Sequence, residues 1–314
     1  MRRGRRSKGR TTDEVFSSVI NEFLASEKFR KLARSTQVNY RHNLLLAERP
    51  DTLGNVPVME LRPALVQAFL DGYGDRLAQQ KCAQTALKSL EKWALVRDKL
   101  PGAITLGTEA PGGTGGHVPW TDEHVALAEQ HAAPHLARAV TLAANTGQRG
   151  SDIIRMRWSD IEDYEGRPGI NVTQYKTGLV IWIPLTQELM TVMRGWERRP
   201  GYFLLKEDGQ PFSRPQLSDQ WLRERDTNAA LAPLGEAGLS MHGLRATAVV
   251  RLRRAGAGVL QIADMVGMSA PMVSRYSRKS VQRENALAAV VYLDARTPRE
   301  QDRHKVTKNQ RIPE

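Results

Sequence analysis

A segment rich in glycine and proline, residues 101–120, divides the chain into two parts of unequal length. Its sequence, PGAITLGTEAPGGTGGHVPW, supports neither helix nor strand and is typical of a linker between domains. A chain of 314 residues also suits two domains of ordinary size. We therefore predict a basic tail at 1–10, a first domain at 11–100, a linker at 101–117, a second domain at 118–295 and a basic tail at 296–314.

The first domain shows helical periodicity. Apolar residues recur at helical spacing in residues 12–26, and similar patterns follow at 34–48, from Pro63 onward and at 76–97. These patterns predict a small all-helical domain.

In the second domain the spacing of apolar residues changes from helical to strand-like in one segment. Helices are expected after Thr121, at 134–145 and at 151–156, whereas residues 169–185 alternate like a β-hairpin that turns at Lys176-Thr177-Gly178. Beyond residue 187 the sequence predicts helices and loops. The predicted fold class is therefore mainly α with a small β-sheet (α+β).

Positive charge is concentrated in the two tails. The formal net charge is +12, of which +6 lies in residues 1–10 and +3 in residues 296–314. Tails of this kind favour a polyanionic partner such as DNA. Cys82 is the single cysteine, so an internal disulfide is excluded, and the sequence has no Cys/His cluster for a metal. No apolar run approaches the roughly 18 residues of a membrane span, and the N-terminus lacks the apolar stretch of a signal peptide, which predicts a soluble protein of the cytoplasm.

Two short stretches carry isolated cations. In TGQRGSDI, residues 146–153, Arg149 lies in a tight turn with Asp152 three residues on, able to hold its guanidinium. In YKTG, residues 175–178, Lys176 lies at the predicted hairpin tip. Taken singly, each is better explained as an ordinary surface residue than as a functional one.

Two further stretches carry a histidine and a tyrosine. In MHGLRATAV, residues 241–249, His242 and Arg245 are three apart, so a helix would project them from one face, where they can bind an oxyanion and move a proton. Tyr276 follows in IADMVGMSAPMVSRYSRK, residues 262–279, on a helix that Ser269 can cap. The cations beside it are Arg275, Arg278 and Lys279.

The last stretch also fits a helix-turn-helix. Ala263, Gly267 and Val273 match its small residue, turn glycine and buried aliphatic, and residues 270–278 would then be a recognition helix in a major groove. A transcriptional regulator is therefore the competing interpretation, although it leaves the other three stretches unexplained.

Taken in chain order, the stretches resemble the tyrosine recombinases, the phage-type integrase family. The shared pattern is an Arg in a TGxR turn, a Lys on a β-hairpin, HxxR, Gly-x-Ser and then Tyr, and the resemblance runs from about residue 12 to residue 290. It implies a helical core-binding domain followed by a mixed catalytic domain. It also implies a site-specific recombinase that cleaves and rejoins DNA and so integrates or excises a mobile element.

The resemblance assigns roles residue by residue. Tyr276 would attack the scissile phosphate and form a 3′-phosphotyrosyl link, with no metal and no cofactor. Arg149 and Arg245 would hold the phosphate oxygens, Lys176 would protonate the leaving 5′-oxygen, and His242 would take the tyrosine proton. The auxiliary residues are Met268, Ser269 and Asp152; the DNA-binding residues are Arg275, Arg278, Lys279, Arg2, Arg3, Arg5 and Arg6.

One position departs from the family pattern. Met268 stands where the family usually has histidine or tryptophan, and a thioether donates no hydrogen bond. Either Ser269 replaces that donor or packing of Met268 against Tyr276 suffices. A catalytically inactive relative is the remaining alternative.

Partners follow from the same resemblance. We expect double-stranded DNA, a homotetramer assembled on it, and accessory DNA-bending or directionality proteins, in a bacterial or phage-encoded system associated with the nucleoid. The apolar residues of segment 283–294 would dock on a neighbouring protomer or pack within their own chain.

Overall fold

A computed structural model describes residues 14–109, 117–198 and 201–294. The chain divides into two compact units, Met1–Thr114 and Gly115–Glu314, each with its own hydrophobic core. The two predicted basic tails lie outside the described residues.

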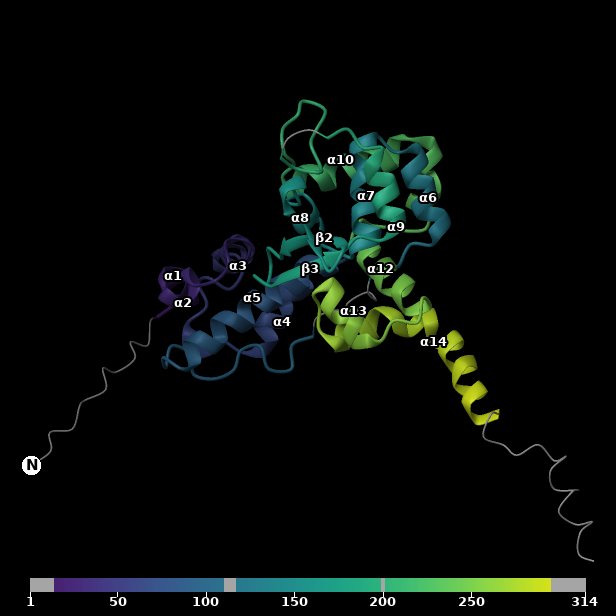
Figure 1. The fold of residues 1–314 in the computed structure, drawn as a ribbon. Coiled ribbons are helices and arrows are strands. Elements are labelled where there is room, and N and C mark those ends of the chain that lie inside the picture. The colour runs from purple at the N-terminus through teal and green to yellow at the C-terminus, as the bar shows by residue number, and fades with distance from the viewer. Residues whose placement is uncertain (1–13, 110–116, 199–200, 295–314) are drawn as a thin grey trace, which may run out of the picture. The chain divides into compact units, whose positions relative to one another are not determined.

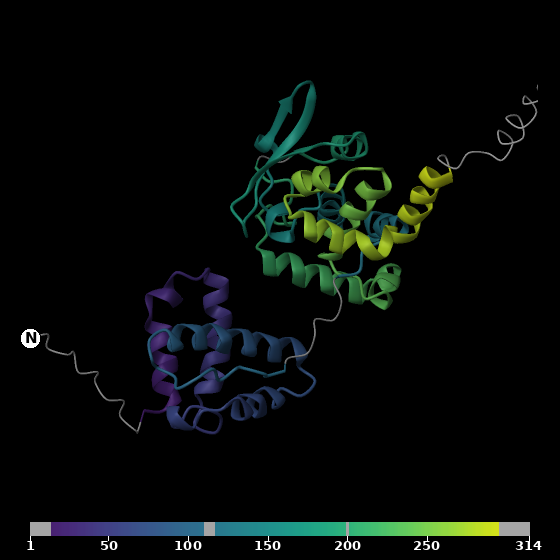
Figure 2. The same cartoon turned by 90° about the horizontal axis from the view of Figure 1, so that it is seen from below.

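The described part of the first unit is helical. Its elements are α1 (Phe16–Ala25), α2 (Glu27–Arg30), α3 (Arg34–Glu48), a 3₁₀ turn (Val58–Glu60), α4 (Pro63–Asp71) and α5 (Leu77–Leu95), drawn from purple to blue in Figure 2. The largest boundary difference from the prediction is at α1, which begins at Phe16 and not at residue 12, while the helix predicted at 76–97 spans Leu77–Leu95. Backbone pairing explains the later start: Val15 forms an isolated β-bridge with Pro57, and the Phe16 amide donates to the Val56 carbonyl over 3.0 Å.

The second unit combines helices with a small sheet. Its helices are α6 (Asp122–His131), α7 (Pro134–Thr146), α8 (Gly150–Ile153), α9 (Gln187–Arg194), α10 (Arg214–Thr227), α11 (Ala232–Glu236), α12 (Gly243–Arg254), α13 (Val259–Val266) and α14 (Ala270–Asp294). Local sequence signals account for several ends: the Thr121 hydroxyl caps α6, Pro134 opens α7, and Gly147 ends α7 in the left-handed region at φ +64°. The mainly α fold with a small sheet is confirmed.

The sheet has one strand more than the predicted hairpin. β1 (Ile161–Tyr164), β2 (Arg167–Thr173) and β3 (Val180–Pro184) form an antiparallel sheet in chain order, with Ile170 opposite both Ile161 and Ile183. β1 escaped prediction because only Ile161 of its four residues is shielded from solvent, so it shows no alternation.

The last three helices bring the C-terminal part of the unit to the sheet. α12, α13 and α14 contact one another, and α13 contacts β3 (Figure 1). Val249, Ile262, Val266 and Val273 form a small core there, against which Met268 and Tyr276 pack. The start of α14 is thereby held near the hairpin. Segment 283–294 continues α14 as one helix.

Across the three described ranges, no helix combines the length and the apolar character that a bilayer span needs.

Candidate active site

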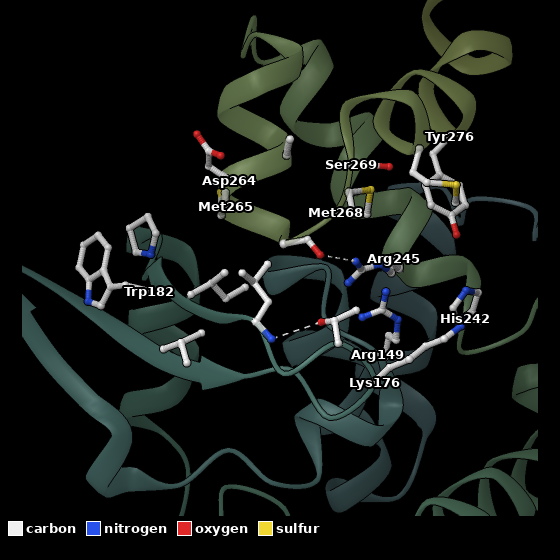
Figure 3. Close-up of a pocket in the computed structure, with 18 residues that line it drawn as sticks. Arg149, Lys176, Trp182, His242, Arg245, Asp264, Met265, Met268, Ser269 and Tyr276 are labelled. Atoms are coloured by element: carbon white, nitrogen blue, oxygen red, sulfur yellow. Dashed lines mark hydrogen bonds between the residues drawn. The ribbon is translucent and has the colours of Figure 1, made fainter. Parts of the chain in front are cut away.

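A pocket of about 990 Å³ in the second unit collects the predicted catalytic side chains. Its lining includes Arg149, Lys176, His242, Arg245 and Tyr276, together with Met268 and Ser269. Figure 3 shows the two guanidinium groups side by side, with His242 and the Tyr276 hydroxyl at one end and Lys176 running beneath them. Residues spread over 128 positions of sequence therefore face one space.

Arg149 is held at the entrance to α8, where it is the residue before the first helical turn. Its Nη1 donates to the Gln174 Oε1 over 3.3 Å and lies 3.8 Å from the Asp152 Oδ2. Asp152 is buried behind the pocket, and its other oxygen accepts from the Tyr175 amide over 2.9 Å. Asp152 thus ties the arginine to the hairpin, and the expected contact between Arg149 and Asp152 is present.

Arg245 is almost completely buried in the first turn of α12. Its Nη1 donates to the Gly147 carbonyl over 2.6 Å and its Nη2 to the Gly267 carbonyl over 3.3 Å. Both glycines have left-handed backbone, with φ of +64° and +63°. Burial, with Arg149 close by, lowers the pKa of Arg245 to about 10, so it remains a cation at neutral pH.

His242 lies at the start of α12 in a half-buried position. The His117 ring packs edge-on against it with centroids 4.5 Å apart, and the His117 Nδ1 lies 2.9 Å from the Ser240 hydroxyl. Burial, followed by His117 and the arginines of the pocket, lowers the pKa of His242 to about 4. The imidazole is therefore neutral at pH 7 and has a free lone pair for a proton.

Lys176 lies in the exposed turn between β2 and β3. Gly178 gives the turn its left-handed residue at φ +69°, and the Gly178 amide donates to the Gln174 carbonyl over 2.8 Å. In addition to the backbone bonds that close the hairpin, the Thr177 hydroxyl donates to the Gln174 Oε1 over 3.0 Å. The lysine therefore reaches the pocket from a turn with few packing contacts of its own.

Tyr276 lies two turns into α14, partly shielded against the small core. Met268 packs against the same core, while Ser269 is exposed and directly precedes the helix. The helix pair with a left-handed Gly267 between its members is present, as the helix-turn-helix interpretation required. The turn, however, lines the pocket and supplies a carbonyl to Arg245.

The predicted DNA-binding residues fall into two groups. Arg275 and Arg278 are exposed on α14 and do not line the pocket. The side chain of Lys279 is outside the described part, as are Arg2, Arg3, Arg5 and Arg6. In the described ranges, no three His, Cys, Asp or Glu side chains come together in a way that would hold a metal ion.

Sequence reasoning missed four polar residues around the pocket. Gln148 and Gln174 are buried and hydrogen-bonded to each other, the Gln174 Nε2 donating to the Gln148 Oε1 over 2.9 Å. His117 packs on His242, and the half-buried Arg214 guanidinium lies against Gly150, where a Cβ would meet its Nε at 2.7 Å. Both glutamines lie one or two residues from a predicted catalytic cation, which is the one signal that pointed to them.

Comparison with known proteins matches this arrangement to one family. The model of the phage integrase family matches residues 123–283, just over half of the chain. No curated protein sequence matches.

Solved structures share the fold at low sequence identity. A lambda integrase dimer bound to a COC′ core site has a TM-score of 0.66 and 23% identity, over 84% of this chain and 77% of that one. A lambda integrase tetramer bound to a Holliday junction has 0.66 and 22%, over 82% and 78%. The Tn1549 transposon integrase in complex with circular intermediate DNA has 0.64 and 15%, over 83% and 94%. With the family match across the pocket, the chain belongs to the phage integrase family, the tyrosine recombinases that break and rejoin DNA.

Proposed function

We propose that this chain cleaves and rejoins DNA through a covalent bond between Tyr276 and a 3′-phosphate, and thereby integrates or excises a mobile element. The observation that carries the proposal is the pocket itself, in which a tyrosine hydroxyl faces two arginines, a lysine and a histidine that is neutral at pH 7. A cationic pocket of this kind suits a phosphodiester, and the tyrosine supplies a nucleophile.

The chemistry balances without an external energy source. The Tyr276 oxygen bonds to phosphorus, the bond from phosphorus to the 5′-oxygen breaks, and His242 accepts the tyrosine proton. Lys176 donates a proton to the departing 5′-oxygen. A 5′-hydroxyl of another strand then attacks the phosphotyrosine and reverses each transfer, so the phosphodiester energy is conserved.

The arginines would hold the non-bridging oxygens. Two of the five N–H groups of Arg245 are directed to backbone carbonyls, so three remain for phosphate. Because those carbonyls fix the guanidinium before DNA arrives, charge that develops on phosphorus meets an already oriented donor. Asp152 would be an auxiliary residue whose carboxylate orients the Arg149 guanidinium in a similar way. Met268 would act by packing beside Tyr276, with Ser269 as the nearby hydroxyl donor.

DNA contacts would extend beyond the pocket. The exposed Arg275 and Arg278 of α14 would bind neighbouring phosphates, and the basic tails with Lys279 would add salt-dependent affinity. We further propose that residues 11–100 form a core-binding domain joined by the 101–117 linker to a catalytic domain at 118–295. The solved relatives in complex with DNA support this proposal.

Strand exchange joins two sites, so we propose a homotetramer on DNA. One solved relative is a tetramer bound to a Holliday junction. On the distal part of α14, Leu287, Val290 and Val291 are 72%, 48% and 66% exposed and share one helix face by their spacing, so they offer an apolar surface that a partner can cover. Changing all three to serine should leave binding to a single site intact and abolish the pairing of two sites in mass photometry.

The covalent step is tested with Tyr276→Phe and DNA from the flanks of the gene. The wild type should form a protein–DNA adduct that survives denaturation, most abundantly on nicked suicide substrates. Tyr276→Phe should bind DNA within about fivefold of wild type, since a hydroxyl contributes only about 1 kcal/mol to a neutral hydrogen bond, and should form no adduct. Tyr175→Phe, in the exposed turn, is the matched control and should form adducts normally.

Two outcomes would contradict the proposal. Adducts from Tyr276→Phe would place the nucleophile elsewhere. Wild-type protein that shifts its own flanking DNA yet never forms an adduct would favour a DNA-binding regulator or an inactive relative.

A further inference from the structure

Gln174 is a buried polar residue that the proposed chemistry does not use. It follows β2 directly, has no exposed surface and lies between the hairpin turn and the end of α13. A glutamine side chain in such a place is costly unless each polar atom finds a partner. Its partners therefore show what the residue connects.

The side-chain amide makes four hydrogen bonds. The Nε2 donates to the Val266 carbonyl over 3.0 Å and to the Gln148 Oε1 over 2.9 Å. The Oε1 accepts from the Arg149 Nη1 over 3.3 Å and from the Thr177 hydroxyl over 3.0 Å. Since a guanidinium only donates and a backbone carbonyl only accepts, these partners allow a single orientation of the amide.

Gln148 completes the connection on the other side. Its Nε2 donates to the Thr146 carbonyl over 3.2 Å and to the Val266 carbonyl over 3.0 Å, so both glutamines bind the same backbone oxygen. The residue after Val266 is Gly267, whose carbonyl accepts from Arg245. A Cβ on Gly267 would lie 2.5 Å from the Gln174 Nε2, so the glycine is what permits this close approach.

The backbone of Gln174 also closes the hairpin. Its amide donates to the Leu179 carbonyl over 2.8 Å, and its carbonyl accepts from the Gly178 amide over 2.8 Å. Lys176 lies inside the loop that these two bonds close. One residue thus contacts the turn that carries Lys176, the guanidinium of Arg149 and the backbone that leads to Gly267.

We propose that Gln174 is a positioning residue whose Oε1 holds Arg149 and, through Thr177, the Lys176 turn on one shared acceptor. This inference rests on the proposed function, in which Arg149 binds the phosphate and Lys176 protonates the leaving oxygen. Because the Arg149 guanidinium and the Thr177 hydroxyl bind the same buried atom, the distance between Arg149 and the backbone of the Lys176 turn is restricted before DNA binds. Misplacing a reacting group by about 1 Å can cost about 10²-fold in rate, which is the scale of the expected effect.

The test separates the two ties with two substitutions. Thr177→Val keeps the side-chain shape but removes the hydroxyl, so the turn loses its bond to the Gln174 Oε1 while Arg149 stays bound to Gln174. Gln174→Met keeps the length but loses both ties. Single-turnover cleavage is measured on nicked DNA with the normal 5′-oxygen and on DNA with sulfur at that bridging position, which leaves readily without a proton.

The two variants should respond differently to sulfur. Thr177→Val should cleave oxygen DNA about 10-fold more slowly and sulfur DNA near the wild-type rate, because only proton donation is impaired. Gln174→Met should lose about 10²-fold on oxygen DNA and recover only in part on sulfur DNA, because Arg149 is loosened too. Thr177→Ser retains the hydroxyl and should recover most of the cleavage rate. Thr173→Val, on an exposed β2 position, is the matched control and should cleave as wild type.

Lys176→Ala distinguishes a failure of the proposed function from a failure of the positioning role of Gln174. If sulfur fails to rescue Lys176→Ala, the general-acid role in the proposed function is wrong, whatever the glutamine variants do. If sulfur rescues Lys176→Ala while Thr177→Val cleaves oxygen DNA normally, or is slowed equally on both substrates, the positioning role is wrong. Thr177 is exposed, so its substitution tests the proposal even if Gln174→Met fails to fold.

Discussion

Arg245 and Lys176 bring positive charge to the same pocket from opposite environments. Arg245 is 2% exposed and donates to two backbone carbonyls. Lys176 instead extends from an exposed turn held by the hairpin bonds, the Thr177 hydroxyl and the bond from the Tyr175 amide to Asp152. A group that stabilises developing charge gains from being fixed in advance. A proton donor must reach the leaving oxygen, and an exposed turn can carry it when a hydrogen bond such as that from Thr177 to Gln174 directs the turn. The comparison predicts that substitutions that disturb the hydrogen bonds of Arg245 lower both the folding stability and the cleavage rate. Substitutions in the turn that carries Lys176 should lower mainly the cleavage rate.

The largest expected effect comes from Arg245→Lys. An ammonium group lacks the planar fork that reaches both the Gly147 and Gly267 carbonyls, so at least one loses its donor. Cleavage should fall about 10²–10³-fold, and unfolding free energy by about 2 kcal/mol. Bridging sulfur should not restore the rate, in contrast to Lys176→Ala. Restoration by sulfur would break the comparison, because Arg245 would then be acting in proton transfer.

The second prediction compares two left-handed glycines. Gly178 in the turn has φ +69° with open space around it, whereas Gly267 has φ +63° and is packed against Gln174 and Ile181. Alanine at Gly178 should cost only the left-handed strain, about 1 kcal/mol. Alanine at Gly267 adds steric overlap and should cost at least about twice as much, measured by denaturant unfolding. Equal losses at the two sites would show that the Gly267 surroundings yield as easily as the turn.

The smallest expected effect concerns pH. The folded-state pKa of His242 is about 4, below the ordinary 6.5, because of burial, His117 and the arginines of the pocket. Between those values the unfolded chain binds more protons, so stability is present above pH 6.5 and is lost as pH falls toward 4. At pH 5.5 the loss from this group should be about 1 kcal/mol.

His242→Asn provides the control for this pH effect. Its unfolding free energy should fall less steeply than that of the wild type between pH 6.5 and 4.5. Comparing the same slope for His117→Asn shows which of the two histidines causes the pH dependence. Identical slopes for wild type and His242→Asn would mean that His242 titrates in the folded state as it does in the unfolded chain.

Local sequence signals predicted much of the fold because they act within a few residues. Pro63, Thr121 and Gly147 mark helix ends through backbone geometry or a single hydrogen bond, and the structure has helix boundaries at all three. The same reasoning misplaced the start of α1, which depends on pairing with residues some 40 positions away. It also missed β1, whose exposed residues carry no periodic pattern.

The candidate site also has a part that the sequence predicted and a part that only the structure shows. The types and chain order of Arg149, Lys176, His242, Arg245 and Tyr276 were sufficient to predict the family and to name the side chains that line the pocket. Nothing in the sequence indicated that two glycine carbonyls orient Arg245. Nor did it show that two buried glutamines share the Val266 carbonyl, or that His117 lies on His242. Those contacts span 22 to 125 residues, and only the tertiary fold brings such distant groups within hydrogen-bonding distance and removes the water that would otherwise satisfy them.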